Sequence, residues 1–350
     1  MRVNFILPRN TNKPMGGYKI VYQYAKRLAL DGNEVHVFFA MFGSKFNLKT
    51  ILRKIDGLTL HKQKYRSISW FDLKNVKIHY DQTDEQVYKI SKGKTIATHW
   101  ATAKFVNGCH CKNNEKFYFI QDYEIFDSNV TKEQLEETWK YPIQKIMVSK
   151  WLVKKAREMG ISSKNINYVP NFIDTNEFPI INNELTQRNC ISFLWHNNVR
   201  KQSDMGIRIA EKLKKTYPLL KIIMFGSDIS AKPNNIIIVD NADIRQLNNI
   251  YRHSIVYFMP SRREGWGLTG MEAMACGAAV ATIDNGGIWE YANDKSAIIV
   301  KNNEDELFKA IKRLIDNSSL RKKIVNNAFN EIKNFTFNKS YQKLLITLGI

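Results

Sequence analysis

The stretch that most constrains the fold of this chain covers residues 258–290 and reads FMPSRREGWGLTGMEAMACGAAVATIDNGGIWE. It completes the apolar run 255–259, passes through a polar bend, and continues in small residues with a helical pattern at 271–275. This order predicts a strand, a loop, a helix and a further strand. Glu264 lies at the start of the loop, and Glu272 lies one to two turns into the helix. We therefore expect two carboxylates to face one crevice above the strand ends, where open α/β sheets bind ligands.

The remainder of the chain alternates short apolar runs with helical patterns, which is typical of parallel sheets with helices on both faces. Strands are expected at 2–7, 34–39, 94–98, 116–120, 146–148, 167–169, 190–195, 220–225, 236–239 and 298–300. Amphipathic helices are expected to close the chain at 304–316, 320–334 and 338–348. A length of 350 residues fits two domains. The polar stretch 176–189 marks the boundary between them.

Several features of the composition indicate a cytoplasmic protein. No apolar run reaches the ~20 residues that a membrane-spanning helix needs, and the apolar run at the N-terminus is too short for a signal peptide. The four cysteines, at 109, 111, 190 and 276, are too scattered for a disulfide framework and favour a reducing compartment. The triplet Cys109-His110-Cys111 has no second ligand pair at zinc-like spacing, so we predict no metal site there.

The positive charge of the chain is unevenly distributed. The formal net charge is +20, of which residues 1–170 contribute +14 and residues 171–350 contribute +6. A basic excess indicates an anionic partner, which is either nucleic acid or an anionic membrane. Each basic residue near an acidic lipid surface adds about 1 kcal/mol to membrane binding. The alternative is a solvated basic surface that has no partner. The stretch 44–86 mixes basic and aromatic residues without a defined pattern. It is either a contact region for an acceptor or a membrane, or an ordinary solvated edge.

Candidate binding residues in the first half follow the expected strands. Gly16-Gly17 opens a helix after the first strand, where backbone N–H groups approach a phosphate or sugar closely or simply form a turn. The strands 94–98 and 116–120 end in His99-Trp100 and in Gln121-Asp122-Tyr123-Glu124. Because parallel strands present their C-terminal ends to one crevice, Asp122 and His99 are candidates for acceptor binding or proton transfer. A lone histidine beside a tryptophan is also commonly a structural residue.

Two features in the second half predict a diphosphate ligand. Arg200 and Lys201 lie in a loop between a strand end and a helix start, so that either cation is able to meet an anion that also contacts the helix N-terminus. The helix start at 267–269, Gly-Leu-Thr, offers exposed N–H donors beside small residues. Glu272 is placed to accept hydrogen bonds from vicinal hydroxyls such as those of a ribose, and Glu264 from a second polyol. The alternative for each glutamate is a solvated face or a salt bridge.

Glu264 and Glu272, with seven residues between them, match the E-x7-E motif of the large retaining glycosyltransferase family conventionally numbered four. The context EGWGLTGMEAMACGAAVA, followed by Glu290 in GGIWE, resembles that family closely. Segments 149–152 and 169–174 resemble its crossing between domains, and Gly16-Gly17 resembles its N-terminal glycine loop. The resemblance therefore covers nearly the whole chain.

This resemblance implies a GT-B fold, with two Rossmann-like parallel-sheet domains facing across a cleft. Residues 1–170 would form the acceptor-binding domain, 171–335 the nucleotide-sugar-binding domain, and 336–350 a helix packing back on the first domain. The implied catalytic residues are Glu264, Asp122, Arg200 and Lys201. The implied donor-binding residues are Glu272, Gly265, Trp266, Gly267, Leu268, Thr269 and Gly226. The implied acceptor or phosphate loop residues are Gly16, Gly17, His99 and Gln121.

The resemblance also implies a reaction. A hexose would pass from a nucleoside diphosphate sugar to a hydroxyl of a glycan or lipid-linked glycan, with the anomeric configuration kept, in bacterial cell-surface polysaccharide synthesis. The chain contains no Asp-x-Asp, which fits chemistry without a metal or other cofactor. Arg200, Lys201 and helix N-termini would stabilise the leaving group, which would itself help to deprotonate the acceptor. The two-carboxylate scheme of glycosidases is not implied.

The chain departs from the pattern of this family in two places. Where the family usually has an arginine, residues 193–196 read Phe-Leu-Trp-His, and Gln202 replaces the glycine after Lys201. Where many members have a histidine, residues 121–124 read Gln-Asp-Tyr-Glu, which looks like the branch containing rhamnosyltransferases of bacterial surface polysaccharides. Two alternatives follow. One is an inactive GT-B scaffold or partner subunit. The other is a basic nucleic-acid-binding protein, which gives no reason for the two glutamates.

Overall fold

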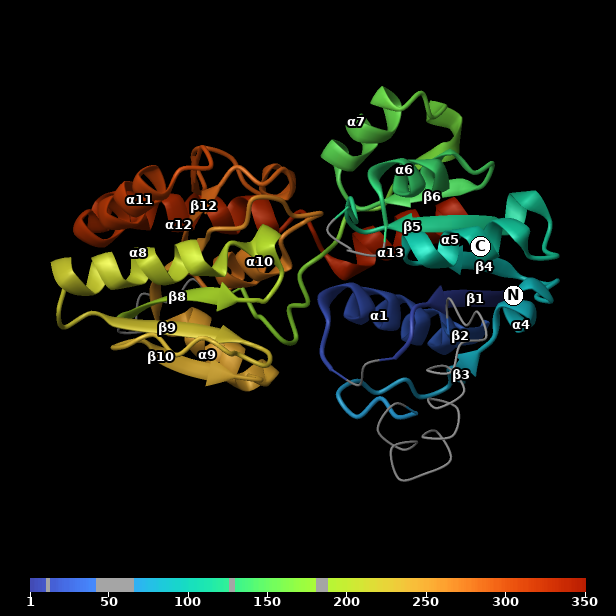
Figure 1. Ribbon diagram of the computed structural model, residues 1–350, viewed down its shortest axis with the longest axis horizontal. Coiled ribbons are helices and arrows are strands. Elements are labelled where there is room, and N and C mark those ends of the chain that lie inside the picture. Colours follow the sequence, from blue (N-terminus) through green and yellow to red (C-terminus); the bar gives the residue numbers. More distant parts are fainter. Residues whose placement is uncertain (11–12, 42–65, 126–129, 181–187) are drawn as a thin grey trace. The chain divides into compact units, whose positions relative to one another are not determined.

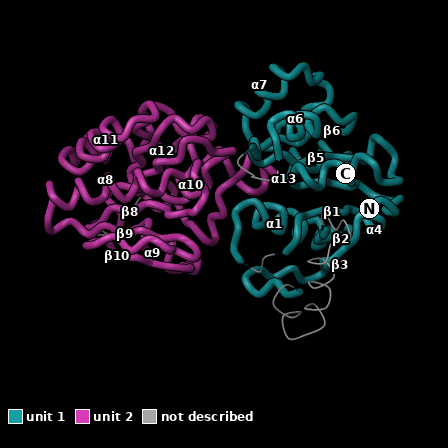
Figure 2. Tube along the Cα trace, viewed as in Figure 1, with its two compact units in different colours: residues 1–169, 341–350 teal, residues 170–340 magenta. Residues whose placement is uncertain are grey.

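The computed structural model describes residues 1–10, 13–41, 66–125, 130–180 and 188–350 (Figure 1). The chain forms two compact units (Figure 2). Unit 1 comprises Met1–Val169 and Tyr341–Ile350, and unit 2 comprises Pro170–Ser340. Residues 44–65 of the predicted contact region 44–86 lie outside the described residues. No helix among the residues that the structure describes is long and apolar enough to cross a membrane.

Unit 1 contains one parallel sheet of seven strands. The strands are β1 (Arg2–Leu7), β2 (Glu34–Ala40), β3 (Lys77–Gln82), β4 (Lys94–Ala97), β5 (Lys116–Ile120), β6 (Gln144–Met147) and β7 (Ile166–Tyr168). They pair in the order β3-β2-β1-β4-β5-β6-β7. The helices are α1 (Gly16–Leu30), α4 (Asp84–Tyr88), α5 (Trp100–Gly108), α6 (Lys132–Lys140) and α7 (Lys150–Glu158), with 3-10 turns at Asn113–Glu115 and Ser163–Asn165.

Strand β3 lies where the sequence predicted no element. The available signal was the alternation of Ile78 and Tyr80 with polar residues. It is weak because β3 is an edge strand that is only partly buried.

Unit 2 contains a second parallel sheet, of six strands. They are β8 (Cys190–Trp195), β9 (Lys221–Gly226), β10 (Ile237–Asp240), β11 (Ser254–Met259), β12 (Ala279–Ile283) and β13 (Ile298–Val300). They pair in the order β10-β9-β8-β11-β12-β13. The helices are α8 (Ser203–Thr216), α9 (Ile244–His253), α10 (Leu268–Ala275), α11 (Glu304–Asp316) and α12 (Ser318–Ile332), with 3-10 turns η3 (Val199–Lys201) and η4 (Gly287–Glu290). The predicted α/β fold with parallel sheets is confirmed.

Both sheets have the same topology, and this topology predicts where ligands bind. In each unit the first strand lies inside the sheet. The next two strands in the sequence are added on one side of it, and the later strands are added on the other side. The order therefore reverses between β1 and β4 in unit 1, and between β8 and β11 in unit 2. In open α/β sheets, ligands bind at such switch points, beside the C-terminal ends of the strands. A binding site is therefore expected in the loops that follow β1, β4, β8 and β11.

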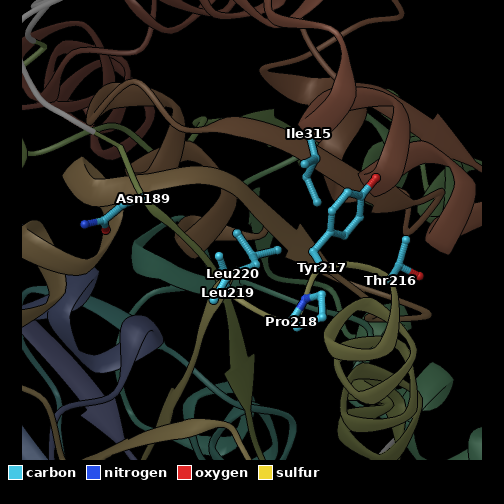
Figure 3. Close-up of a pocket in the computed structure, with 7 residues that line it drawn as sticks. All are labelled: Asn189, Thr216, Tyr217, Pro218, Leu219, Leu220 and Ile315. Carbon is cyan, nitrogen blue, oxygen red and sulfur yellow. The ribbon is translucent and has the colours of Figure 1, made fainter.

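The core of unit 2 is formed by strands packed against α8 and α11. Leu307, Ile311 and Leu314 of α11 are fully buried, at the spacing that places residues on one helix face. At the N-terminal ends of β8 and β9, an open hollow of about 480 Å³ is lined mainly by apolar side chains (Figure 3). Its lining residues are Asn189, Thr216, Tyr217, Pro218, Leu219, Leu220 and Ile315. This hollow therefore lies at the opposite ends of the strands from the loops of the switch point.

The last helix, α13 (Phe337–Leu348), carries the chain from unit 2 back into unit 1. From Tyr341 onward it packs within unit 1, where Tyr341 is buried and its hydroxyl donates to Asp31 Oδ2 at 2.7 Å. The Tyr341 ring also stacks against Tyr24, with ring centroids 6.5 Å apart. Leu344 and Leu348 continue the buried face of the helix. The C-terminal segment is therefore part of the packing of unit 1.

Two histidines join the edge strand β3 to β2. His36 Nδ1 lies 2.8 Å from His79 Nε2, and the other ring nitrogen of His36 lies 3.1 Å from Glu34 Oε1. Lys77 Nζ also contacts Glu34 Oε1, at 2.6 Å. Burial lowers the pKa of both histidines, and the positive charges of Arg2 and Lys77 lower it further. Both rings are therefore neutral in the folded protein at neutral pH.

This pair predicts that unit 1 loses stability as the solution becomes acidic. The unfolded chain takes up protons near the ordinary histidine pKa of 6.5, whereas the folded chain does so only at lower pH. The contribution of the two histidines to the stability of unit 1 is therefore complete above the ordinary histidine pKa and is lost as pH falls below it. Thermal unfolding of unit 1 between about pH 7.5 and pH 5.5 is the measurement. His79→Phe is expected to reduce the pH dependence of thermal unfolding. The control His110→Gln, at an exposed histidine, is expected to leave this pH dependence unchanged. An equal dependence in wild type and His79→Phe would contradict this account.

Candidate functional site

The loops that follow β8 and β11 meet at the switch point of unit 2. Lys201 Nζ contacts both oxygens of Glu264, at 2.7 and 2.9 Å. Arg200 Nη1 lies 3.6 Å from Glu264 Oε2 and donates to the carbonyl of Arg263 at 2.9 Å. The backbones are joined as well, because Arg262 N donates to Arg200 O at 2.8 Å. The predicted residues Arg200, Lys201 and Glu264 are thus one cluster, which we call the switch-point cluster.

Burial and charge together determine the state of Glu264. Its side chain is 7% exposed, and those of Arg200 and Lys201 are each 14% exposed. Burial alone would raise the pKa of Glu264, but the charges of Lys201 and Arg200 outweigh burial and hold the pKa below its usual range. The carboxylate is therefore ionised, and the cluster as a whole carries one excess positive charge. Such a cluster in a strand-to-helix loop is suited to binding an anion.

The conformation of the loop after β8 is set by local hydrogen bonds. Ser203 Oγ donates to His196 O and accepts from His196 N, both at 2.8 Å. Asn198 N donates to His196 Nδ1 at 2.9 Å, so the neutral ring carries its hydrogen on Nε2. Gln202 has a left-handed φ of 50°, a conformation that glycine adopts more easily. His196, to which the sequence assigned no role, therefore has a fixed tautomer at the same strand end as the two cations.

The start of α10 is held by a close approach of two loops. Gly267 caps the helix with a φ of 91°, and its carbonyl accepts from Tyr291 Oη at 2.7 Å. A Cβ on Gly287 would lie 2.5 Å from the carbonyl oxygen of Trp266, so only glycine allows this contact. Trp266 is 3% exposed. Gly265 is also buried, and Leu268 and Thr269 are half-buried in the first turn.

Glu272 has a partner on a neighbouring helix. It is half-buried on α10, and its Oε2 accepts a hydrogen bond from Tyr251 Oη of α9 at 3.2 Å. Gly226 ends β9 beside Trp195, and a Cβ there would lie 2.4 Å from the Trp195 carbonyl. The structure therefore joins Glu264 to the two cations and joins Glu272 to a buried tyrosine that the sequence did not indicate.

In unit 1, a buried carboxylate that the sequence analysis did not single out lies at the N-terminus of α5. Glu124 is 8% exposed and accepts from Trp100 N at 2.8 Å and from Tyr118 Oη at 3.2 Å. His99 caps α5, with its Nδ1 accepting from Ala101 N, and its Nε2 lies 3.5 Å from Glu124 Oε1. The capping contacts match the structural alternative for His99. The available signal for Glu124 was a second acidic residue after the same strand as Asp122.

The other predicted residues of unit 1 lie near the ends of β1 and β5. Gly16 begins α1 and is exposed. A Cβ on Gly17 would lie 3.3 Å from Gln121 Nε2, so Gly17 and Gln121 are neighbours. Asp122 is half-buried, and its Oδ1 accepts from Tyr123 N at 2.8 Å. The structure thus brings Gly17 to Gln121 and His99 to Glu124.

Two Rossmann-like units with parallel sheets, one carrying the switch-point cluster, define a GT-B fold. The chain matches two solved structures over nearly their full length. Anabaena HepE, solved with UDP and glucose, gives a TM-score of 0.74 at 14% identity, covering 100% of this chain and 99% of that chain. S. aureus TarM, solved with fondaparinux, alpha-GlcNAc-glycerol and UDP, gives 0.73 at 11% identity, covering 100% of both. At these identities the likeness establishes the fold.

The sequence of unit 2 is similar to a known family. Residues 176–331 match the family model described as Glycosyl transferases group 1. An uncharacterized glycosyltransferase of Methanocaldococcus jannaschii is 36% identical over 83 residues. That match spans 23% of this chain and 24% of the archaeal protein. The group 1 segment contains the switch-point cluster and Glu272.

Proposed function

We propose that this protein is a retaining glycosyltransferase of the E-x7-E type, which moves a hexose from a nucleoside diphosphate sugar to a hydroxyl of a glycan or lipid-linked glycan. The observation that carries the proposal is the switch-point cluster, a net positive group at the strand ends of a group 1 domain. Unit 2 would bind the donor. Glu272 would accept hydrogen bonds from the ribose, and residues 265–269 and Gly226 would border the nucleotide and sugar.

The proposed reaction breaks the bond between the anomeric carbon and the diphosphate oxygen, and forms a bond from that carbon to the acceptor oxygen on the same face. The acceptor proton passes to the leaving diphosphate. Arg200 and Lys201 would stabilise the negative charge that develops on this group, because fixed cations act strongly in a site shielded from water. Glu264 would hold Lys201 in place and contact the donor sugar. No metal or other cofactor takes part in the proposed chemistry, in agreement with a sequence that lacks Asp-x-Asp.

Unit 1 would bind the acceptor in this proposal. Asp122 would orient the acceptor hydroxyl, with Gln121 and the Gly16-Gly17 helix start beside it and His99 at the next strand end. The residues 1–170 carry a net charge of +14, which supports contact with the anionic inner face of the cell membrane, where a lipid-linked acceptor resides. Bacterial cell-surface polysaccharide synthesis, with rhamnose as one candidate sugar, is the proposed context.

A nucleotide-sugar panel tests the proposal. Incubation with uridine, guanosine, adenosine and thymidine diphosphate sugars and a set of glycan acceptors is expected to release nucleoside diphosphate with one donor. Analysis of the product by NMR is expected to show the anomeric configuration of the donor. Tight nucleotide binding without turnover on any pair would favour an inactive scaffold. Salt-sensitive duplex binding without nucleotide binding would favour a nucleic-acid-binding protein.

Glu272→Ala is expected to weaken donor binding by about 10- to 100-fold, because hydrogen bonds from a ribose to a charged group are lost. Isothermal titration calorimetry with the donor that the panel identifies measures this change. Glu306→Ala, which removes an exposed carboxylate from the first turn of α11, is the matched control in the same unit. Unchanged donor affinity in Glu272→Ala would exclude the ribose role.

A further inference from the structure

Tyr251 has the surroundings of a residue that holds another side chain in place. It lies in the last turns of α9 and is fully buried. Its ring is packed edge to face against three other aromatic rings, with centroids 5.9 Å from Phe178, 5.6 Å from Phe225 and 5.5 Å from Tyr257. Packing on three sides fixes the ring, and the hydroxyl at its tip is therefore fixed as well.

The hydroxyl of Tyr251 is directed at one of the two motif glutamates. It donates to Glu272 Oε2 at 3.2 Å, which is longer than the roughly 2.5–3.0 Å of a typical O–H···O bond. Burial, and then the negative charge of Glu272, raise the pKa of Tyr251 well above its ordinary value, so the hydroxyl keeps its proton and remains a donor. A glutamate side chain otherwise rotates about three bonds, and ordering it on ligand binding has an entropic cost. A rigid donor lowers this cost.

We propose that Tyr251 is a positioning residue that holds the carboxylate of Glu272 ready for the ribose hydroxyls of the donor. This inference rests on the proposed function. An ionised carboxylate has about four acceptor positions, so a bond from Tyr251 leaves capacity for two ribose hydroxyls. Tyr251 does not touch the donor; it acts through Glu272. Its contribution therefore belongs to recognition of the ribose and not to the transfer step.

The test is Tyr251→Phe, which removes the hydroxyl and keeps the ring. Glu272 is half-exposed, so the change leaves no fully buried carboxylate unpaired. The control is Tyr257→Phe, which removes a hydroxyl from an equally buried ring that packs against Tyr251. Thermal melting of each variant establishes that unit 2 is folded.

The probes are the nucleoside diphosphates UDP, GDP, ADP and TDP, each in its ribose form. The nucleoside diphosphate that wild type binds most tightly is then compared with its 2′-deoxy form. Tyr251→Phe is expected to weaken binding of the ribose form about tenfold and to reduce the preference over the deoxy form, with kcat at saturating donor within about twofold of wild type. Tyr257→Phe is expected to bind both forms as wild type does. In a Glu272→Ala background, which removes the acceptor, Tyr251→Phe is expected to have no further effect.

The inference and the proposed function fail in different ways. If wild type binds no nucleoside diphosphate, the proposed function is wrong, and the inference with it. If wild type binds one of them and Tyr251→Phe binds it equally well, only the inference is wrong. An equal loss for the ribose and deoxy forms, or an undiminished effect in the Glu272→Ala background, would show a general packing role for Tyr251 and would also overturn the inference.

Discussion

Replacing Lys201 with methionine is expected to lower the rate of sugar transfer by about 100- to 1,000-fold, the effect of removing one fixed donor from a developing negative charge. Methionine retains the length of the side chain and removes its charge. Lys201 Nζ contacts both oxygens of Glu264, so the substitution also leaves that carboxylate with Arg200 as its remaining cation, at 3.6 Å. Steady-state release of nucleoside diphosphate measures the rate.

The same substitution is expected to destabilise unit 2 by about 3 kcal/mol, because breaking a buried ion pair leaves a charge poorly compensated. Urea unfolding followed by tryptophan fluorescence measures this change. The matched control is Lys212→Met, whose ion pair with Glu304, at 2.8 Å, lies on the protein surface. Such a pair contributes at most about 1 kcal/mol. Wild-type activity in Lys201→Met would contradict the role of the switch-point cluster.

The pH dependence of unfolding provides a second readout of this pair. The pKa of Glu264 is below its usual value in the folded protein, because Lys201 and Arg200 outweigh the effect of burial. The stability from this group is therefore fully present above the ordinary glutamate pKa of 4.5 and is lost as pH falls through the lower folded value. Lys201→Met is expected to reduce the loss of stability that Glu264 causes as the solution becomes acidic. Lys212→Met is expected to leave this loss of stability unchanged.

Asp122→Asn is expected to slow transfer by about 100-fold or more while leaving donor affinity near wild type, since a carboxylate that orients an acceptor hydroxyl acts on the transfer step. Single-turnover rates and calorimetric donor binding separate the two effects. Glu85→Gln removes an exposed carboxylate from α4 of the same unit and is the control. An equal loss of transfer and donor binding would remove Asp122 from the acceptor side.

Glu124→Gln is a necessary companion to that experiment. Glu124 follows the same strand and is buried against the N-terminus of α5, where Trp100 N donates to it. We expect Glu124→Gln to lower the thermal stability of unit 1, because a carboxylate at a helix N-terminus is favourable there. A larger loss of transfer in Glu124→Gln than in Asp122→Asn, with the fold intact, would transfer the acceptor role to Glu124.

Local sequence patterns were sufficient for much of the fold. Periodicity located β1, α1, β5, β8 and α11 to within a residue or so, because each depends on a run of side chains that share one face. The strand β3 was missed because an edge strand buries too little of each side chain to require a long apolar run. Strand order was also beyond the sequence, since pairing between β1 and β4 depends on residues about 90 positions apart.

The sequence by itself determined which residues are candidates for chemistry: two glutamates at a set spacing, a basic loop, and polar residues after apolar strands. Only the tertiary structure decided which of them meet. It joined Lys201 to Glu264 across 63 residues, Tyr251 to Glu272 across 21, and Glu124 to the start of α5. The physical reason is that a residue's type and local period follow from its neighbours in the chain, whereas burial and partners, and hence its pKa, arise only when distant loops pack together.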